Sequence, residues 1–255
     1  MNATTDNPPR LTRLTFHGPL SQARAAQLTE RLLRNDPRTV LDIGCGWGEF
    51  LLRLLTAAPQ ATGVGVDLNA EDLARGRKTA AGRGLADRVT FHAESGIGTV
   101  RGPADVVLCL GASQALSDAQ PPHHTAAALT ALHGLVNPGG RVLLGEGFWE
   151  RTPTPDELAG MWPGARADEH PSLAELVDLA VAAGFRPEWI ETADRGEWEE
   201  FESGYRAGTE EWLAAHPSHP AAAELRERID QQRTRWLRGY RDVLGIAYLT
   251  LIREA

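Results

Sequence analysis

The sequence contains few of the features that mark secreted, membrane or metal-binding proteins. Cys45 and Cys109 are its only cysteines, and neither has metal-ligand spacing. No apolar run reaches the roughly 18 residues of a membrane span. Residues 1–9 are polar and lack the apolar core of a signal peptide. These absences predict a cytoplasmic protein with reduced thiols, no bound metal and no membrane partner.

Positive charge is also scarce. Lys78 is the only lysine, and 34 acidic residues outnumber 26 basic ones, which gives a net charge of −8. Phosphate backbones are bound by basic surfaces, so this balance argues against nucleic acid as a partner. The chain has 255 residues, of which 42% are hydrophobic, enough for one large domain with a sizeable core.

A glycine-rich turn is the most informative stretch of the sequence. Residues 40–43 form a short apolar run that predicts a buried strand, and Gly44, Gly46 and Gly48 follow it directly. Apolar residues at helical spacing come next, which indicates strand, turn and helix. Glycine backbone can adopt positive φ and lie against a ligand, and the helix N-terminus offers unpaired N–H groups. A tight turn without a ligand is the alternative.

An acidic residue ends the next predicted strand, at residues 62–67. Asp67 follows the glycine turn by about 20 residues, the distance at which nucleotide-binding folds place a ribose-binding carboxylate. The alternative is that the Asp67 charge only stabilises the N-terminus of the following helix. Asn69, Glu71 and Asp72 already serve that purpose. The two features together favour a nucleotide-like ligand.

Strands and helices alternate along most of the chain, which predicts a parallel sheet wrapped by helices. Residues 1–15 are expected to be loose, and residues 147–171 to form a long loop with a short helix. Residues 194–241 form an insertion rich in aromatic residues. Helices are expected at about 20–34, 70–82, 121–135 and 172–184, and further strands at 88–93, 104–110, 141–146, 185–192 and 245–252.

This pattern resembles a class I S-adenosylmethionine-dependent methyltransferase. The resemblance covers about residues 38–147, from the glycine loop and the strand ending in Asp67 to the Asn-Pro-Gly-Gly turn and the strand after it. It implies a Rossmann-like α/β fold with a seven-stranded sheet, mostly parallel, whose last strand is antiparallel. Residues 145–150 also resemble a poorly characterised bacterial subgroup of small-molecule methyltransferases, in which a histidine often stands where this chain has Gln114.

The resemblance assigns a cofactor site for S-adenosyl-L-methionine, with S-adenosyl-L-homocysteine as product. It implies that the glycine loop binds the methionine and ribose portions, Asp67 the ribose diol, Leu68 the adenine face and Glu94 the adenine amine. The residues expected to bind the cofactor are Asp42, Gly44, Cys45, Gly46, Asp67, Leu68, Glu94, Ser95, Cys109 and Gly111.

The methyl acceptor is expected near the same strand ends. A hydroxyl or ammonium acceptor needs a base, for which the candidates are His17, His124 and Glu146. Each has a structural alternative: His124 could begin a helix, His17 could pack on the glycine loop, and Glu146, at the end of a strand, could bind backbone groups. Gln114, Trp149 and Tyr205 are the candidate substrate-binding residues. Buried packing in a cap is the alternative for the aromatic ones.

The sequence therefore predicts a single methyltransferase domain acting on a small molecule. Its core spans about residues 36–193 and 242–255, with residues 20–34 and 194–241 as a helical cap. The insertion is expected to form a wall or lid of the acceptor pocket, and a homodimer interface is the alternative. The other functions considered are a cofactor-binding protein without turnover and a nucleotide-dependent oxidoreductase. The latter is disfavoured because the glycines are spaced one residue too tightly for its G-x-G-x-x-G motif.

Overall fold

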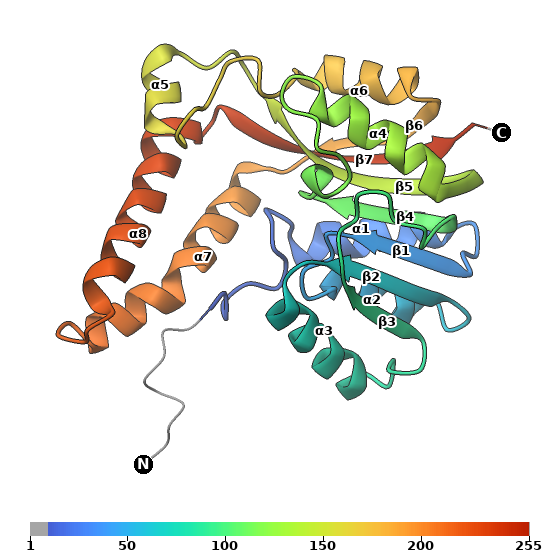
Figure 1. Ribbon diagram of the computed structural model, residues 1–255, viewed down its shortest axis with the longest axis horizontal. Helices are drawn as coiled ribbons and strands as arrows, with labels where there is room; N and C mark the ends of the chain where they lie inside the picture. Colours follow the sequence, from blue (N-terminus) through green and yellow to red (C-terminus); the bar gives the residue numbers. More distant parts are fainter. Residues whose placement is uncertain (1–9, 255) are drawn as a thin grey trace.

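A seven-stranded sheet forms the centre of the computed structural model, which describes residues 10–254 (Figure 1). Its strand order is β3-β2-β1-β4-β5-β7-β6, and only β7 runs antiparallel to its neighbours. This is the predicted fold. The strands are β1 (Thr39–Ile43), β2 (Thr62–Asp67), β3 (Val89–Ala93), β4 (Ala104–Leu110), β5 (Val136–Trp149), β6 (Phe185–Thr192) and β7 (Leu244–Arg253).

Helices cover both faces of the sheet, because alternate strand residues point to opposite sides. In β4, Val106 and Leu108 face the helices α1, α2 and α3, whereas Val107 and Cys109 face α4 and α6. Figure 1 shows these two layers on either side of the sheet. The helices are α1 (Gln22–Leu33), α2 (Glu49–Ala57), α3 (Ala70–Gly82), α4 (His124–Leu135) and α6 (Leu173–Ala182).

Side-chain caps fix where several helices begin, as the sequence predicts. The Ser21 hydroxyl accepts from the Arg24 N–H, and the Asn69 side chain accepts from the first turn of α3. Ser172 and Glu175 form the predicted capping box of α6. None of the described helices is long and apolar enough to cross a membrane.

Strand β5 is longer than predicted at both ends. The Asn-Pro-Gly-Gly segment lies inside it, where the register against β4 shifts between Ala104 and Val106. At the other end, pairing continues along β7 as far as Trp149 and Leu244. The extension beyond Glu146 carries Trp149 to the segment that precedes α6, where the Trp149 N–H donates to the Pro171 carbonyl at 2.8 Å.

The insertion forms a helical hairpin that projects beyond the carboxyl ends of the parallel strands (Figure 1). It consists of α7 (Arg195–Ala215), α8 (Ala222–Arg235) and a π-helical turn, η2 (Trp236–Tyr240); the short α5 (Pro155–Gly160) packs against η2. Trp212 is buried against Leu213 and Leu225 within the hairpin. Trp212 is therefore buried by residues of the hairpin itself. The expectation that residues 1–15 are loose falls partly on residues 1–9, which lie outside the described residues.

Candidate functional site

A cavity of about 630 Å³ opens at the carboxyl ends of β1, β2, β3 and β4. Its floor is the glycine loop between β1 and α2, and its walls come from residues 94–97, 110–115 and 16–20 and from helix α7. The carboxyl ends of parallel strands are where α/β sheets bind ligands, because the strand-to-helix loops meet there. The volume lies within the range of small-molecule sites.

The glycine loop follows the wall of this cavity with left-handed backbone. Gly44, Gly46 and Gly48 have φ of +66°, +54° and +67°. A Cβ on Gly44 would lie 2.2 Å from Ala112 Cβ, and one on Gly48 would meet the Phe91 ring. A Cβ on Gly46 would meet nothing within 4 Å, and Gly46 lines the cavity. The outer glycines are therefore needed for packing, whereas Gly46 leaves space for a ligand.

Two carboxylates lie at the ends of β1 and β2. Asp67 Oδ2 accepts from the Gly46 N–H at 2.8 Å, and Oδ1 accepts from the Asn69 N–H at 2.8 Å. Each oxygen keeps a lone pair for a further donor. Asp42 is buried, and burial raises the pKa of its carboxyl well above the ordinary value, with a further contribution from the charge of Asp67. A cationic group in the cavity would reverse that rise.

Exposed apolar side chains mark another part of the cavity. Leu68 is 76% exposed and Ile97 is 42% exposed, and both line it. Glu94 lies in the same wall, and its carboxylate pairs with Arg101 at 2.9 and 3.0 Å. The Ser95 hydroxyl accepts from the Ile97 N–H at 3.1 Å. This end of the cavity thus combines apolar surface with a hydrogen-bonding carboxylate, as a flat heterocycle requires.

Trp47 fastens the N-terminal segment to the glycine loop. Its indole donates to the Thr15 carbonyl at 2.9 Å, and the His17 ring stacks on it with centroids 5.3 Å apart. Burial lowers the pKa of His17, and the charges of Arg10 and Arg75 oppose Asp72 and Asp67 around it. Burial therefore favours the neutral imidazole, which can accept a proton.

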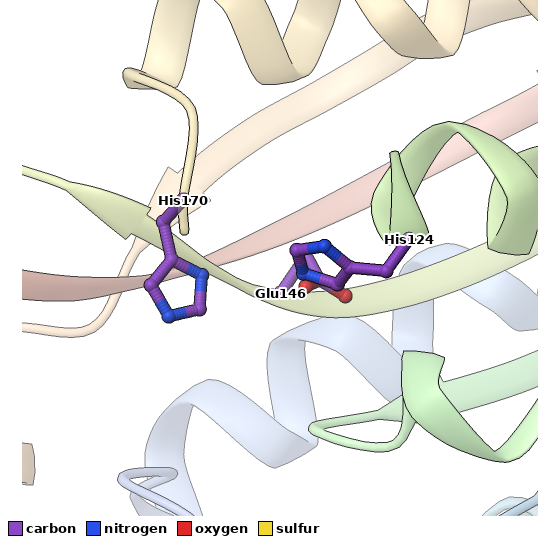
Figure 2. Close-up of side chains that lie close together, drawn as sticks. All are labelled: His124, Glu146 and His170. Atoms are coloured by element: carbon purple, nitrogen blue, oxygen red, sulfur yellow. The ribbon is translucent and has the colours of Figure 1, made fainter. Parts of the chain in front are cut away.

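A second group of polar side chains lies outside the residues that line the cavity. His124, Glu146 and His170 place ligand-capable atoms within 4.8 Å of one another (Figure 2). Burial raises the pKa of Glu146 to about 7, although hydrogen bonds to Ser113 and the Gly147 backbone oppose it. Burial also lowers the pKa of His170 to about 4, and the neighbouring His124 contributes to that shift.

Comparisons with known proteins agree with this geometry. Residues 41–142 match a family model described as a methyltransferase domain. The YjhP protein of Escherichia coli K12 is 28% identical over 93% of this chain and 93% of its own length. Solved structures of S-adenosylmethionine-dependent methyltransferases from Geobacter sulfurreducens and Thiobacillus denitrificans, both in complex with S-adenosyl-L-homocysteine, are similar. Each is 26% identical with a TM-score of 0.81; they cover 98% and 96% of this chain and 100% and 99% of their own.

Residues 41–142 thus match the methyltransferase domain, and nearly the whole chain is similar to S-adenosylmethionine-dependent methyltransferases. The sheet order, the glycine loop and the matched segment all support this similarity.

Most of the residues that the sequence analysis singled out line the cavity of this methyltransferase. They are His17, Asp42, Gly44, Cys45, Gly46, Asp67, Leu68, Glu94, Ser95, Gly111 and Gln114.

Five others do not line it. Cys109 is fully buried in the core, because its side chain points to the α4 and α6 face of the sheet. Tyr205 lies farther along α7, where its ring contacts Phe201 instead. Glu146, His124 and Trp149 gather around His170.

Several residues of the methyltransferase site were missed from the sequence. Trp47, Ile97, Phe201 and Tyr248 line the cavity, and Arg10 reaches it by pairing with Asp72 at 2.9 Å. Trp47 sits inside the glycine motif, so its position was a usable signal. The others come from segments whose approach depends on tertiary packing. His170 had no local signal, since it stands in an irregular stretch.

Proposed function

We propose that this methyltransferase transfers the methyl group of S-adenosyl-L-methionine to a small molecule bound in the cavity. The observation that carries the proposal is the open space above Gly46, bounded by Asp67 at the end of β2. A left-handed glycine with no atom within reach of its Cβ and a carboxylate with free lone pairs suit a ribose-containing ligand.

Each part of the cofactor has a chemically matched surface. Asp67 would accept from the ribose hydroxyls, and the adenine would lie between the exposed side chains of Leu68 and Ile97. The adenine amine could donate to Glu94 beside its Arg101 pair. Asp42, Gly44 and Gly111 would surround the methionine end, where a carboxylate suits the ammonium and sulfonium charges.

Methyl transfer from a sulfonium demands alignment more than proton chemistry. The leaving group is a neutral thioether, so the protein must hold the acceptor atom, methyl carbon and sulfur in line and keep water away. A hydroxyl or amine acceptor also loses a proton. His17 is the cavity-lining candidate for that base, since burial favours its neutral imidazole.

The acceptor side is aromatic and is bounded by the insertion. Trp198 and Phe201 of α7 line the cavity together with Gln114 and Tyr248. Such a surface is suited to a small, partly apolar acceptor, and the net charge of −8 disfavours nucleic acid. The two free thiols are in keeping with a cytoplasmic enzyme.

Mass spectrometry of the denatured, freshly purified protein tests this proposal. We expect S-adenosyl-L-methionine or S-adenosyl-L-homocysteine to co-purify, and no nicotinamide nucleotide. Incubation with methyl-labelled S-adenosyl-L-methionine and pooled small metabolites should then yield a labelled product. Cofactor binding without any labelled product from any acceptor pool would favour a protein without turnover, and a bound nicotinamide would contradict the proposal.

A further inference from the structure

Three side chains from separate elements meet above β5, behind the wall of the cavity. His124 begins α4, Glu146 lies on β5, and His170 lies in the segment that precedes α6. Figure 2 shows the two imidazoles and the carboxylate turned toward a common region. One ligand-capable atom from each lies within 4.8 Å of the other two.

All three side chains have buried polar atoms without a partner in the described structure. These atoms are His124 Nδ1, Glu146 Oε2 and His170 Nδ1. The other nitrogen of His124 lies 3.4 Å from the Thr125 hydroxyl, which leaves Nδ1 as its free atom. An unpartnered buried polar atom costs about 1–3 kcal/mol. Each of the three clustered side chains therefore has a free polar atom that a shared ligand would satisfy.

We propose that His124, Glu146 and His170 bind a divalent transition-metal ion of the zinc or iron(II) type. Two imidazoles and one carboxylate suit these ions, whereas calcium and magnesium prefer oxygen ligands. Bonds of about 2.0–2.2 Å place tetrahedral ligand atoms about 3.4 Å apart, so these atoms need approach by no more than roughly 1.4 Å. Three protein ligands leave a coordination position for water or a substrate atom.

Neighbouring side chains pack against the His170 imidazole, and a nearby charge acts on His124. The His170 ring packs edge-on against Trp149, with centroids 4.9 Å apart. Gly147 makes room for that ring, because a Cβ there would lie 2.8 Å from its Cε1 atom. Glu169 accepts from the Trp162 indole at 3.0 Å, and its charge acts on His124. Such outer partners orient metal ligands.

The proposed metal site shares no residue with the cofactor site. None of its three ligands lines the cavity. The loop after β4 contacts both: Gly111 lines the cavity, and Ser113 is hydrogen-bonded to Glu146. The inference therefore does not rest on the proposed function, and it can be tested without cofactor or acceptor.

Calorimetric titration of the metal-stripped, full-length chain with Zn²⁺ tests the site. We expect one tight zinc ion per chain, and visible absorption from a tetrahedral complex when Co²⁺ replaces it. His124→Ala and His170→Ala should each weaken zinc binding by at least about 100-fold, since outer-shell changes alone cost 10–100-fold. Gly147→Ala keeps all three ligands but displaces the His170 ring, so it should also weaken binding.

His123→Ala is the matched control. His123 immediately precedes α4, its side chain makes no capping hydrogen bond, and it is exposed. This variant should bind zinc like the wild type, and Asp67→Ala should do so even if it loses the cofactor. Circular dichroism confirms that each variant is folded. The proposal is overturned if the folded wild type binds no zinc, or if His170→Ala leaves the affinity unchanged, or if His123→Ala lowers it equally.

Discussion

At the scale of single residues, Gly46 and Gly84 have similar left-handed backbones in different surroundings. Their φ angles are +54° and +70°, and a Cβ on either would meet nothing within 4 Å. Gly46 faces the cavity, whereas Gly84 follows the end of α3. The pair separates the effect of backbone strain from the effect of filling the ligand space.

We expect Gly46→Val to abolish binding of S-adenosyl-L-homocysteine. The new side chain would occupy the open space over the loop and would resist positive φ. Gly84→Val carries the same strain without that obstruction, so it should lose stability but still bind. Thermal denaturation and calorimetric titration of both variants measure the two effects. Normal binding by a folded Gly46→Val would show that the loop does not contact the cofactor.

Asp67→Ala should weaken binding of S-adenosyl-L-homocysteine by about 10- to 150-fold. Two ribose hydroxyls would lose a charged acceptor, at a cost of about 1.5–3 kcal/mol. Asp105→Ala is the control, because Asp105 also accepts from backbone N–H groups, of Arg38 and Thr39, but lies outside the cavity. Equal dissociation constants for Asp67→Ala and the wild type would refute the ribose assignment.

At the scale of elements, the N-terminus of α7 is fixed to α1 by one carboxylate. Glu197 is 5% exposed and accepts from the Ser21 N–H at 3.0 Å and from Arg24 Nε at 2.9 Å. Burial would raise the pKa of Glu197, but the hydrogen bonds from Arg24, Asp194 and Ser21 outweigh it and lower the pKa. The ionised form is thus the one that stabilises the fold.

Glu197→Gln should lower the free energy of unfolding by about 1.5–3 kcal/mol near neutral pH. Because the folded pKa is depressed, this stabilisation exists above the ordinary pKa of 4.5 and is lost as the pH falls through the folded value. Urea denaturation across that pH range should therefore show the unfolding free energies of the wild type and Glu197→Gln converging in acid. Glu175→Gln, in the exposed capping box of α6, should have a smaller effect. If the difference in unfolding free energy between Glu197→Gln and the wild type does not change with pH, the proposed role of the ionised Glu197 is wrong.

Helix α7 should respond to ligand along its cavity-facing part. Trp198 and Phe201 line the cavity, whereas Trp212 is buried within the hairpin. We expect S-adenosyl-L-homocysteine to slow hydrogen exchange in the first two turns of α7 and to leave the hairpin tip around residues 216–221 unchanged. If ligand slows exchange equally in the first turns of α7 and at the hairpin tip, or in neither, α7 is not a wall of the site. A dimer that dissociates on Trp212→Ala would favour the interface alternative.

Local signals determined how much of the fold was predictable. Strands β4 and β6 and helix α3 have the predicted bounds, because their apolar runs, periodicity and caps lie within the elements themselves. The length of β5 was not predictable, since its pairing with β7 joins residues that are far apart in the sequence. The meeting of His124, Glu146 and His170 depends on three separate elements, so no spacing rule could reveal it.

At the scale of the whole molecule, the cavity is closed by segments distant in the sequence. The sheet supplies the glycine loop and the carboxylates. The hairpin projects beyond the carboxyl ends of the same strands (Figure 1). The N-terminal segment crosses between them. It is held by Arg10 on Asp72 at 2.9 Å and by Arg13 on Glu211 at 2.5 Å. The fold therefore brings the proposed cofactor and acceptor surfaces together around one open cavity.

A crystal structure of the full-length chain grown with saturating S-adenosyl-L-homocysteine tests this account most directly. The account predicts the ribose hydroxyls on Asp67, the adenine between Leu68 and Ile97, and the amino-acid portion beside Asp42. The ligand bound elsewhere, or a cavity without ligand density at saturating concentration, would contradict the claim that this cavity is the cofactor site.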